Sequence, residues 1–372
     1  MSSAGTAERT ALPDFPWDSL AADKALAQSH PDGIVDLSIG TPVDPVPAVV
    51  REALSGPAAG IPGYPATHGT PALRDAIAAS LARRFGVTGV DPDAVLPTIG
   101  SKELVAWLPT LLGLGGNDLV VIPELAYPTY EVGARLAGAE FVRSDGLVGL
   151  GPRRASLVWL NSPSNPTGKI LPVDHLRKVV AWARERGAVV ASDECYLGLP
   201  GTADPAPLSV LHPSVCDGDH TGLLAVHSMS KTSNLAGYRA AFVTGDPVLV
   251  SRLLEIRKHA GMLVPHPVQA AMAAAVSDDA HVAAQAALYE ARRTRLRAAL
   301  ESRGMRIEHS ESGLYLWATE DRDGRSTVHD LAAHGVLVAP GEFYGPAGAR
   351  HVRVALSASD ERIDAAVERL TT

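Results

Sequence analysis

The chain has 372 residues, more than the size at which a single hydrophobic core usually stops growing, so we expect two domains. Hydrophobic residues make up 46% of the chain and charged residues 20%, which is typical of a folded globular protein and excludes a disordered chain. The formal net charge of −8 argues against a nucleic-acid partner.

Neither the N-terminus nor the cysteines indicate a secreted or membrane protein. Residues 1–16 lack the apolar core of a signal peptide, and no apolar run approaches the roughly 18 residues of a membrane span. Cys195 and Cys216 form no C-x-x-C pair, so we expect two free thiols and no metal site. These features predict a cytoplasmic protein that does not bind membranes.

From about residue 94, short β-rich runs alternate with segments of helical length. We predict strands at 94–99, 119–122, 140–142, 157–160, 188–192, 223–227 and 240–244. Helices are expected between them, at 102–112, 130–137 and 173–186. Such alternation predicts an α/β fold with a large, mostly parallel sheet that is covered by helices on both faces. The segment 201–221, rich in Pro, Asp and His, is expected to be a surface loop.

After residue 246 the pattern becomes helical, and a long helix at 283–303 is expected to lead into a second, smaller unit. Short strands are predicted there at 305–308, 314–318, 336–338 and 352–356, with helices at 326–334 and 361–370. We therefore predict a large domain at 44–278 and a smaller α+β domain at 279–372.

One lysine stands out by its neighbours. Lys231 follows two hydroxyls, Ser228 and Ser230, at the end of a predicted buried strand, and Arg239 lies eight residues further on. A lysine amine can form an imine with an aldehyde, while hydroxyls and a guanidinium are suited to a phosphate. An aldehyde and a phosphate on one molecule indicate pyridoxal 5′-phosphate (PLP). This segment alone leaves a surface lysine among serines as an equal alternative.

Six further segments resemble, in the same order, motifs of the class I, fold-type I PLP-dependent aminotransferases. They are Tyr64 with 69–74, then 100–103, 127–130, 161–168, 192–196 and 352–355. The resemblance covers nearly the whole chain. It implies a large PLP-binding domain, a smaller domain that also takes up residues 1–43, and a homodimer.

The resemblance also assigns roles around the cofactor. Lys231 would hold PLP and shuttle a proton, and burial beside cationic neighbours would lower its pKa. Asp193 would pair with the protonated pyridine nitrogen, while Asn165 and Tyr196 would hydrogen-bond the ring's 3′-oxygen. Composition alone would equally suit a plain turn around Asn165. The rival lysines, which lack the serines and the arginine, are Lys102, Lys169 and Lys258.

The phosphate would be bound at a helix start and by the next subunit. Backbone amides at the beginning of a helix attract anions, and the amides expected here belong to Gly100, Ser101 and Lys102. The resemblance implies that Tyr127 stacks on the cofactor ring, although a tyrosine of the core is an equal alternative from the sequence. It also implies that Tyr64 reaches the phosphate of the neighbouring subunit.

A charged residue inside a predicted strand indicates where a substrate binds. Arg353 lies between Val352 and Val354, and a charge in such a place is rare unless it is paired. The resemblance implies that it grips the substrate α-carboxylate through paired N–H groups, beside Asn165. Gly40 would add a close backbone contact.

Four stretches resemble the N-succinyl-diaminopimelate aminotransferases of lysine and peptidoglycan biosynthesis. They are 12–17, 37–45, 99–104 and 257–261. The implied reaction uses glutamate as donor and returns 2-oxoglutarate, with Lys102, His68 or Arg257 as candidate binders of a distal carboxylate and 15–17 as a lid. Another class I aminotransferase (for aspartate, alanine or histidinol phosphate) and a PLP-dependent β-lyase remain alternatives. A PLP-sensing regulator is disfavoured because residues 1–31 are too few for a winged helix.

Overall fold

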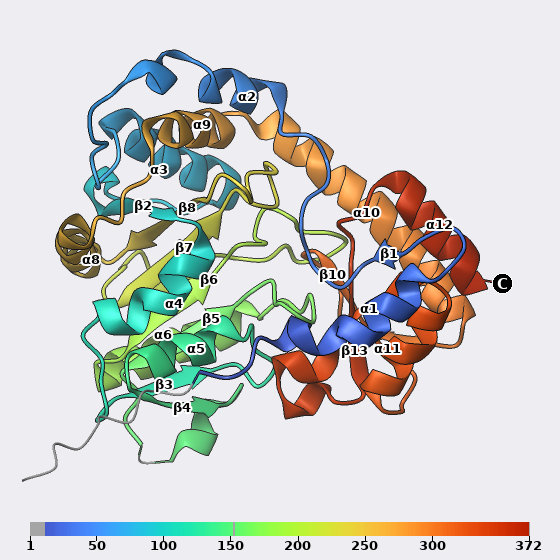
Figure 1. The fold of residues 1–372 in the computed structure, drawn as a ribbon. Helices are drawn as coiled ribbons and strands as arrows, with labels where there is room; N and C mark the ends of the chain where they lie inside the picture. Colours follow the sequence, from blue (N-terminus) through green and yellow to red (C-terminus); the bar gives the residue numbers. More distant parts are fainter. Residues whose placement is uncertain (1–11, 152, 372) are drawn as a thin grey trace, which may run out of the picture.

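The computed structural model describes residues 12–151 and 153–371, and it shows two lobes joined by a long helix, α10 (Asp279–Ser302) (Figure 1). The expectation that residues 1–16 carry no signal peptide falls largely outside the described residues. No helix of the described part is long and apolar enough to cross a membrane.

The large lobe is built on a seven-stranded sheet in the order β2-β8-β7-β6-β5-β3-β4. Only β8 runs antiparallel to its neighbours, so the sheet is mostly parallel, as predicted. The strands are β2 (Val95–Ile99), β3 (Leu119–Ile122), β4 (Glu140–Arg143), β5 (Leu157–Asn161), β6 (Val189–Asp193), β7 (Leu223–Ser228) and β8 (Ala240–Gly245).

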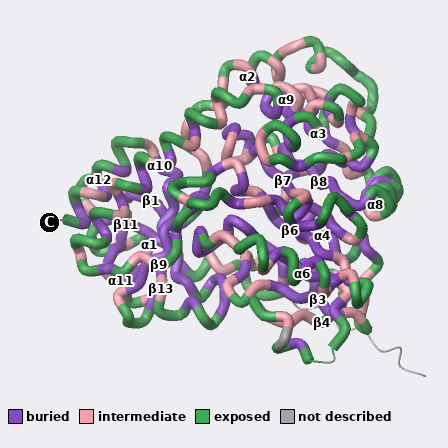
Figure 2. Tube along the Cα trace, turned by 180° about the vertical axis from the view of Figure 1, so that it is seen from behind, coloured by how far each residue is buried: buried purple, intermediate pink, exposed green. Residues whose placement is uncertain are grey.

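Helices cover both faces of this sheet, and each face forms its own hydrophobic core. One core involves α3 (Pro71–Phe85), α6 (Val173–Arg186) and α9 (His266–Ser277), with α2 (Ala48–Leu54) beside them. The other involves α4 (Ser101–Leu111), α5 (Thr129–Leu136) and α8 (Pro247–Ala260). Successive strand residues point to opposite faces, which explains why the inner strands β3, β5 and β7 read as largely apolar runs and are buried throughout (Figure 2).

The smaller lobe contains an antiparallel sheet in the order β12-β13-β10-β9. Its strands are β9 (Arg306–Glu308), β10 (Tyr315–Thr319), β12 (Ala339–Pro340) and β13 (His351–Ala355), and its helices are α11 (Gly324–Ala333) and α12 (Asp360–Thr371). The N-terminal segment reaches this lobe, because β1 (Val35–Asp36) pairs with β11 (Val336–Leu337) and α1 (Ala21–Gln28) contacts α11. The domain boundaries near 43/44 and 278/279 stay a prediction.

Two expectations need correction. Helix α10 begins four residues before the predicted start, because the Asp278 side chain accepts a hydrogen bond from Ala280 N at 2.8 Å and caps it. The segment 201–221 is a surface loop only in its first part. Its second part contains the short helix α7 (Pro213–Cys216) and buries Val210, where the backbone N–H donates to Glu194 Oε1 at 2.8 Å. A short apolar run, here around Val210, is enough to bury part of a segment whose overall composition is polar.

Single turns of 3-10 helix complete the chain. They are η1 (Pro16–Leu20), η2 (Pro57–Gly60), η3 (Pro92–Ala94), η4 (Leu147–Leu150), η5 (Gly341–Tyr344) and η6 (Pro346–Gly348).

Candidate active site

Three parallel strands end at the same edge of the large sheet, and their last residues open the candidate site. The register sets Asn161 of β5 opposite Asp193 of β6, while β7 ends at Ser228 next to them. The crossover through α6 therefore brings the predicted turn after Asn161 and the predicted turn after Asp193 together. Asn161, which the sequence did not single out, joins them: its Nδ2 donates to Asp193 O at 2.8 Å and its Oδ1 accepts from Asn165 N at 2.7 Å.

Asp193 is a buried carboxylate without a cationic partner. Its Oδ2 accepts a hydrogen bond from the Tyr130 hydroxyl at 2.9 Å, and its Oδ1 accepts from Cys195 N at 3.2 Å. Burial raises the pKa of this carboxyl, and no basic side chain forms an ion pair with it within residues 12–151 and 153–371. A buried charge is costly unless it is paired, so the site fits a ligand with a protonated ring nitrogen.

The aromatic rings beside Asp193 come mainly from α5 and its neighbour β5. Tyr130 is fully buried and stacks on Trp159 with ring centroids 4.9 Å apart. Tyr127, the ring expected from the sequence, contacts Tyr130 edge-on at 5.9 Å and is only partly buried; desolvation raises its pKa to about 12. The stacking role of Tyr127 stays a prediction, and the sequence did not single out Tyr130 as the residue bound to Asp193.

Lys231 lies at the boundary of the two lobes. Its Nζ donates a hydrogen bond to the carbonyl oxygen of Gly40, in the N-terminal segment. Desolvation is the main cause that lowers the pKa of this amine, the charges of Arg353 and Arg239 add to it and Cys195 opposes it, and together they bring the pKa to about 8. A Cβ at Gly40 would overlap the hydroxyl oxygen of Tyr315, so the close approach requires glycine.

Hydroxyls, a helix start and a guanidinium lie where the phosphate loop was predicted. Ser101 is the first residue of α4, and Gly100 precedes it with φ of 78°. The Arg239 guanidinium occupies the space that a Cβ of Gly100 would need. Ser228 Oγ donates to Ser230 Oγ at 2.9 Å. Arg239 has no carboxylate partner in the described part of the chain, so this group fits an anion such as a phosphate.

Arg353 is buried to 2% exposure on β13 and likewise has no carboxylate partner among the described residues. Its Nη1 donates to Asn165 Oδ1 at 2.8 Å and its Nη2 to Ser38 O at 2.7 Å. The guanidinium lies 3.9 Å from the ring centroid of Tyr315 and 4.9 Å from that of Tyr344. These two tyrosines, which the sequence did not indicate, flank the arginine and restrict its orientation.

Tyr196 also belongs to this group. Its hydroxyl lies 3.0 Å from the hydroxyl of Tyr315, and the two rings meet edge to face at 5.7 Å. Tyr64, in contrast to these buried groups, is 95% exposed.

The three residues expected to bind a distal carboxylate lie in different surroundings. Arg257 is wrong for this role, because it is fully buried and binds Glu103 through two hydrogen bonds of 2.9 and 3.2 Å. His68 is engaged by Asp93 O at 3.0 Å and by Arg74 Nη1 at 2.8 Å. Lys102 lies with its Nζ 5.6 Å from the ring centroid of Phe15 and has no acidic partner among the residues described; burial, with help from the charge of Arg239, lowers its pKa.

The chain matches the family model "Aminotransferase class I and II" over residues 32–370. It is 65% identical to "Probable aminotransferase Rv1178" of Mycobacterium tuberculosis, covering 97% of this chain and 85% of the relative. It is 58% identical to the 4-dedimethylamino-4-oxo-anhydrotetracycline transaminase OxyQ of Streptomyces rimosus, covering 97% and 99%. The structure of a probable N-succinyldiaminopimelate aminotransferase from Thermus thermophilus superposes with a TM-score of 0.85 at 28% identity, covering 96% and 99%.

Proposed function

Since the chain belongs to the class I and II aminotransferases, which depend on PLP, we propose that it catalyses the transamination of N-succinyl-LL-2,6-diaminopimelate with 2-oxoglutarate and glutamate, in lysine biosynthesis. The observation that carries this choice is Lys102, whose ammonium lies against Phe15 of the N-terminal segment without an acidic partner among the described residues. Glutamate and the N-succinyl substrate both carry a second carboxylate that such a group would bind.

The proposed cofactor contacts follow from the unpaired groups. Lys231 would hold PLP through its amine, and Asp193 would pair with the ring nitrogen. The phosphate would lie among Ser228, Ser230, Arg239 and the amides of Gly100, Ser101 and Lys102, with Tyr127 stacked on the ring. When bound, PLP supplies an electron sink for the charge that develops at the amino-acid Cα.

The remaining residues would orient the substrate and move its proton. Arg353 would grip the α-carboxylate with the guanidinium N–H groups that its bonds to Asn165 and Ser38 leave free, Nε among them. Because Asn165 Oδ1 is taken by Arg353, its Nδ2 would donate to the cofactor's 3′-oxygen, together with the Tyr196 hydroxyl. With a pKa of about 8, the Lys231 amine would take the proton from Cα near neutral pH.

The proposal includes a homodimer in which Tyr64 of one subunit reaches the phosphate of the other. A tyrosine with 95% of its surface exposed is available to a neighbouring subunit, which supports this arrangement. Both cysteines are free, which suits the proposed reducing cytoplasm.

A second candidate acceptor comes from the relative with 58% identity, which is named for a 4-oxo-anhydrotetracycline substrate. A polycyclic ketone has no α-carboxylate for Arg353, so its binding would depend on the aromatic rings and on the N-terminal segment. Trp17 packs on Phe343 at 5.3 Å and Phe15 on Trp17 at 5.5 Å, which leaves an aromatic surface at the mouth of the site.

Steady-state rates with 2-oxoglutarate would test the proposal on N-succinyl-LL-2,6-diaminopimelate, aspartate and alanine as donors. We expect the N-succinyl compound to have the highest kcat/KM of the three. If aspartate is best, the substrate assignment is wrong and the family assignment stands. Amination of the oxo-tetracycline by glutamate at a higher kcat/KM would favour the second candidate, and release of ammonia would indicate a lyase.

The variant Lys102→Met tests the residue on which the choice of substrate depends. We expect KM to rise about 10-fold or more for glutamate and the N-succinyl substrate, in line with about 1.5–3 kcal/mol for a hydrogen bond to a charged group. The KM of alanine, which has no distal carboxylate, should not change. An equal rise in KM for glutamate, the N-succinyl substrate and alanine would mean that Lys102 contributes only to cofactor binding. Lys258→Met, at an exposed lysine paired with Glu255, is the control.

A further inference from the structure

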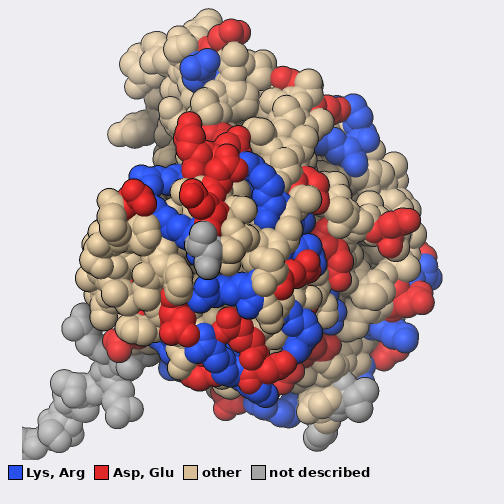
Figure 3. Space-filling model, turned by 90° about the vertical axis from the view of Figure 1, so that its right-hand side faces the viewer, with Lys and Arg blue, Asp and Glu red and all other residues tan. Residues whose placement is uncertain are grey.

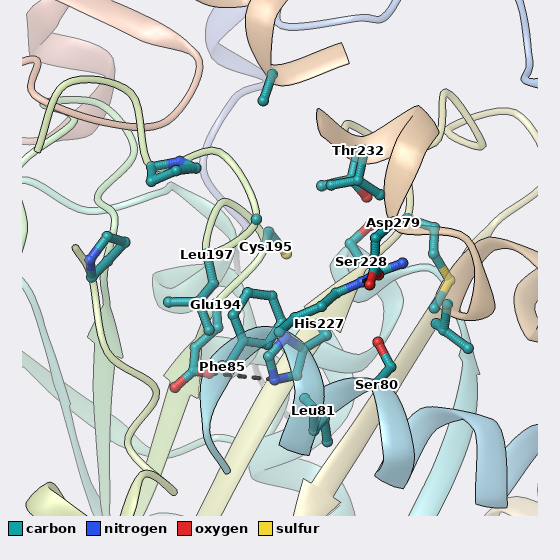
Figure 4. Close-up of a pocket in the computed structure, with 18 of the residues that line it drawn as sticks. Ser80, Leu81, Phe85, Glu194, Cys195, Leu197, His227, Ser228, Thr232 and Asp279 are labelled. Atoms are coloured by element: carbon teal, nitrogen blue, oxygen red, sulfur yellow. Dashed lines mark hydrogen bonds and ion pairs between the residues drawn. The ribbon is translucent and has the colours of Figure 1, made fainter. Parts of the chain in front are cut away.

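A second cavity adjoins the candidate active site but contains none of its charged groups. It has a volume of about 540 Å³ and lies between the end of α3, the segment 197–208 and the start of α10 (Figure 4). Cys195 and Ser228 line it from the turns that carry the proposed cofactor contacts, whereas Lys231, Arg239 and Arg353 do not. Most of its wall is apolar, including Leu81 and Leu197.

Glu194 and His227 are a buried polar pair in this wall, which also contains the hydroxyls of Ser80, Ser228 and Thr232. Glu194 Oε1 is occupied by the backbone N–H of Val210 at 2.8 Å, and its Oε2 lies 3.3 Å from His227 Nε2. This is the one polar contact of the His227 imidazole with the residues that the structure describes. Burial lowers the pKa of His227 to about 3, so its ring is neutral and offers one N–H donor and one acceptor.

Aromatic rings stack on the faces of the His227 imidazole, while its edge is open to a hydrogen bond. Phe242 stacks on it with centroids 4.9 Å apart and an interplanar angle of 19°, and Phe85 lies at 6.0 Å and 17°. Both rings, together with the thioether of Met229, also line the cavity. Ring edges and sulfur are favourable neighbours for another aromatic ring.

The charged side chains at the rim already bind one another and neighbouring carbonyl oxygens, which favours an uncharged ligand inside the cavity. Arg83 Nε binds Asp279 Oδ2 at 2.7 Å, and Arg84 binds the other oxygen of the same carboxylate. Both guanidinium groups also donate to carbonyl oxygens at the end of α9 and the residue that follows it.

We propose that this cavity is a binding site for a small uncharged aromatic molecule, with its ring among the apolar side chains and one hydrogen-bonding group on the edge of His227. A volume of about 540 Å³ lies in the range of small-molecule pockets, roughly 300–1,000 Å³. Because Glu194 follows Asp193 and His227 precedes Ser228, a bound molecule would be adjacent to the cofactor site. The inference does not depend on the substrate proposed above.

Phenol is a suitable probe, titrated into the PLP-loaded enzyme by calorimetry. We expect saturable binding at one site per chain, and a change in the visible absorbance of the cofactor at saturation. Ala283→Trp fills the mouth of the cavity from the first turns of α10 and should abolish binding. Ala284→Trp, at the next and equally exposed position, does not line the cavity and should leave binding intact. The proposal is overturned if phenol shows no saturable binding, or if both variants bind phenol equally well.

The role of His227 is tested by comparing phenol with toluene, which has the same size and no hydroxyl. In His227→Phe the ratio of phenol to toluene affinity should fall about 3- to 10-fold, as expected for one hydrogen bond. An unchanged ratio would exclude His227 as the polar anchor. Should this variant fail to fold, the pair of tryptophan variants still decides whether the site exists.

Discussion

At the scale of single residues, two charges define the site: one carboxylate and one guanidinium that are buried without a counter-charge among the described residues. Within the described residues the Asp193 carboxylate accepts hydrogen bonds from the Tyr130 hydroxyl and the Cys195 N–H, and the Arg353 guanidinium donates to neutral oxygens. Burying either group is unfavourable for the protein alone, so ligand binding must contribute to the stability of this arrangement.

Arg353→Lys tests the carboxylate grip. A point ammonium cannot reproduce the guanidinium fork or its stacking between Tyr315 and Tyr344, so we expect kcat/KM to fall about 10- to 100-fold for donor and acceptor alike. Steady-state kinetics on both half-reactions would measure this. Arg350→Lys, at an exposed position just before the same strand, is the matched control. An unchanged kcat/KM would assign Arg353 a purely structural role.

The acidity of Lys231 can be measured in the cofactor-free protein. Its amine should become reactive toward an acylating reagent as pH rises through about 8, because desolvation and the charges of Arg353 and Arg239 disfavour the protonated form. Replacing Arg353 by Met removes one of these positive charges, so the midpoint should move to higher pH. Peptide mapping after labelling at several pH values gives both midpoints. A midpoint near the ordinary lysine value in the unmodified protein would contradict the prediction.

At the scale of elements, the start of α4 is held in place by an ion pair with α8. Arg257 is fully buried and binds both oxygens of Glu103, and Glu103 Oε2 also accepts from Ile99 N at 3.3 Å. Because Glu103 binds both Arg257 and the backbone of Ile99, the ion pair holds the adjacent turn at Gly100 in place. This accounts for Arg257 without a role in substrate binding.

Arg257→Met should destabilise the protein by an amount toward the lower end of about 3–5 kcal/mol, because Glu103 would lose its partner while remaining 19% exposed. Adding Glu103→Gln should recover part of that loss, which a double-mutant cycle on the urea-induced unfolding free energy would show. Lys258→Met, beside Arg257 but on the surface, should change the stability by less than about 0.5 kcal/mol. Strict additivity of the two changes would mean that the pair contributes nothing.

At the scale of the whole molecule, the N-terminal segment connects the two lobes. Asp44 binds Arg292 of α10 through two hydrogen bonds of 2.8 and 2.6 Å, and Trp17 packs on Phe343. On the side of the smaller lobe, acidic and basic side chains are interspersed (Figure 3). Ion pairs such as Arg295 with Asp364 account for part of this pattern.

The proposed dimer gives a prediction at this scale. Sedimentation should give twice the mass of one chain, and Tyr64→Phe should keep that mass while weakening PLP binding about 10-fold or more, since one hydrogen bond to a charged phosphate is lost. Cofactor titration of the apoprotein measures the affinity. A monomer with full PLP affinity, or a dimer unaffected by the substitution, would contradict a shared site.

Much of the fold and part of the site could be predicted from the sequence. Strands β2 to β8 lie within one residue of their predicted ends, and most of them are buried strands that read as apolar runs bounded by turn residues. Lys231 stood out by its neighbouring hydroxyls and Arg239, whereas the roles expected of Asn165 and Asp193 came from a family resemblance. The turns that carry these residues meet because the ends of parallel strands lie at one edge of the sheet.

Only the tertiary structure showed which side chains complete the site. Tyr130 meets Asp193 across 63 residues, and Tyr315 reaches Arg353 from the neighbouring strand β10. Arg257 looked like a candidate substrate binder until Glu103, distant in sequence, proved to be its partner. The sequence by itself determined the periodicity, the turns and the motif spacing, since these depend on near neighbours. Pairings between distant segments depend on how the layers pack, and a single sequence does not encode that packing in any local pattern.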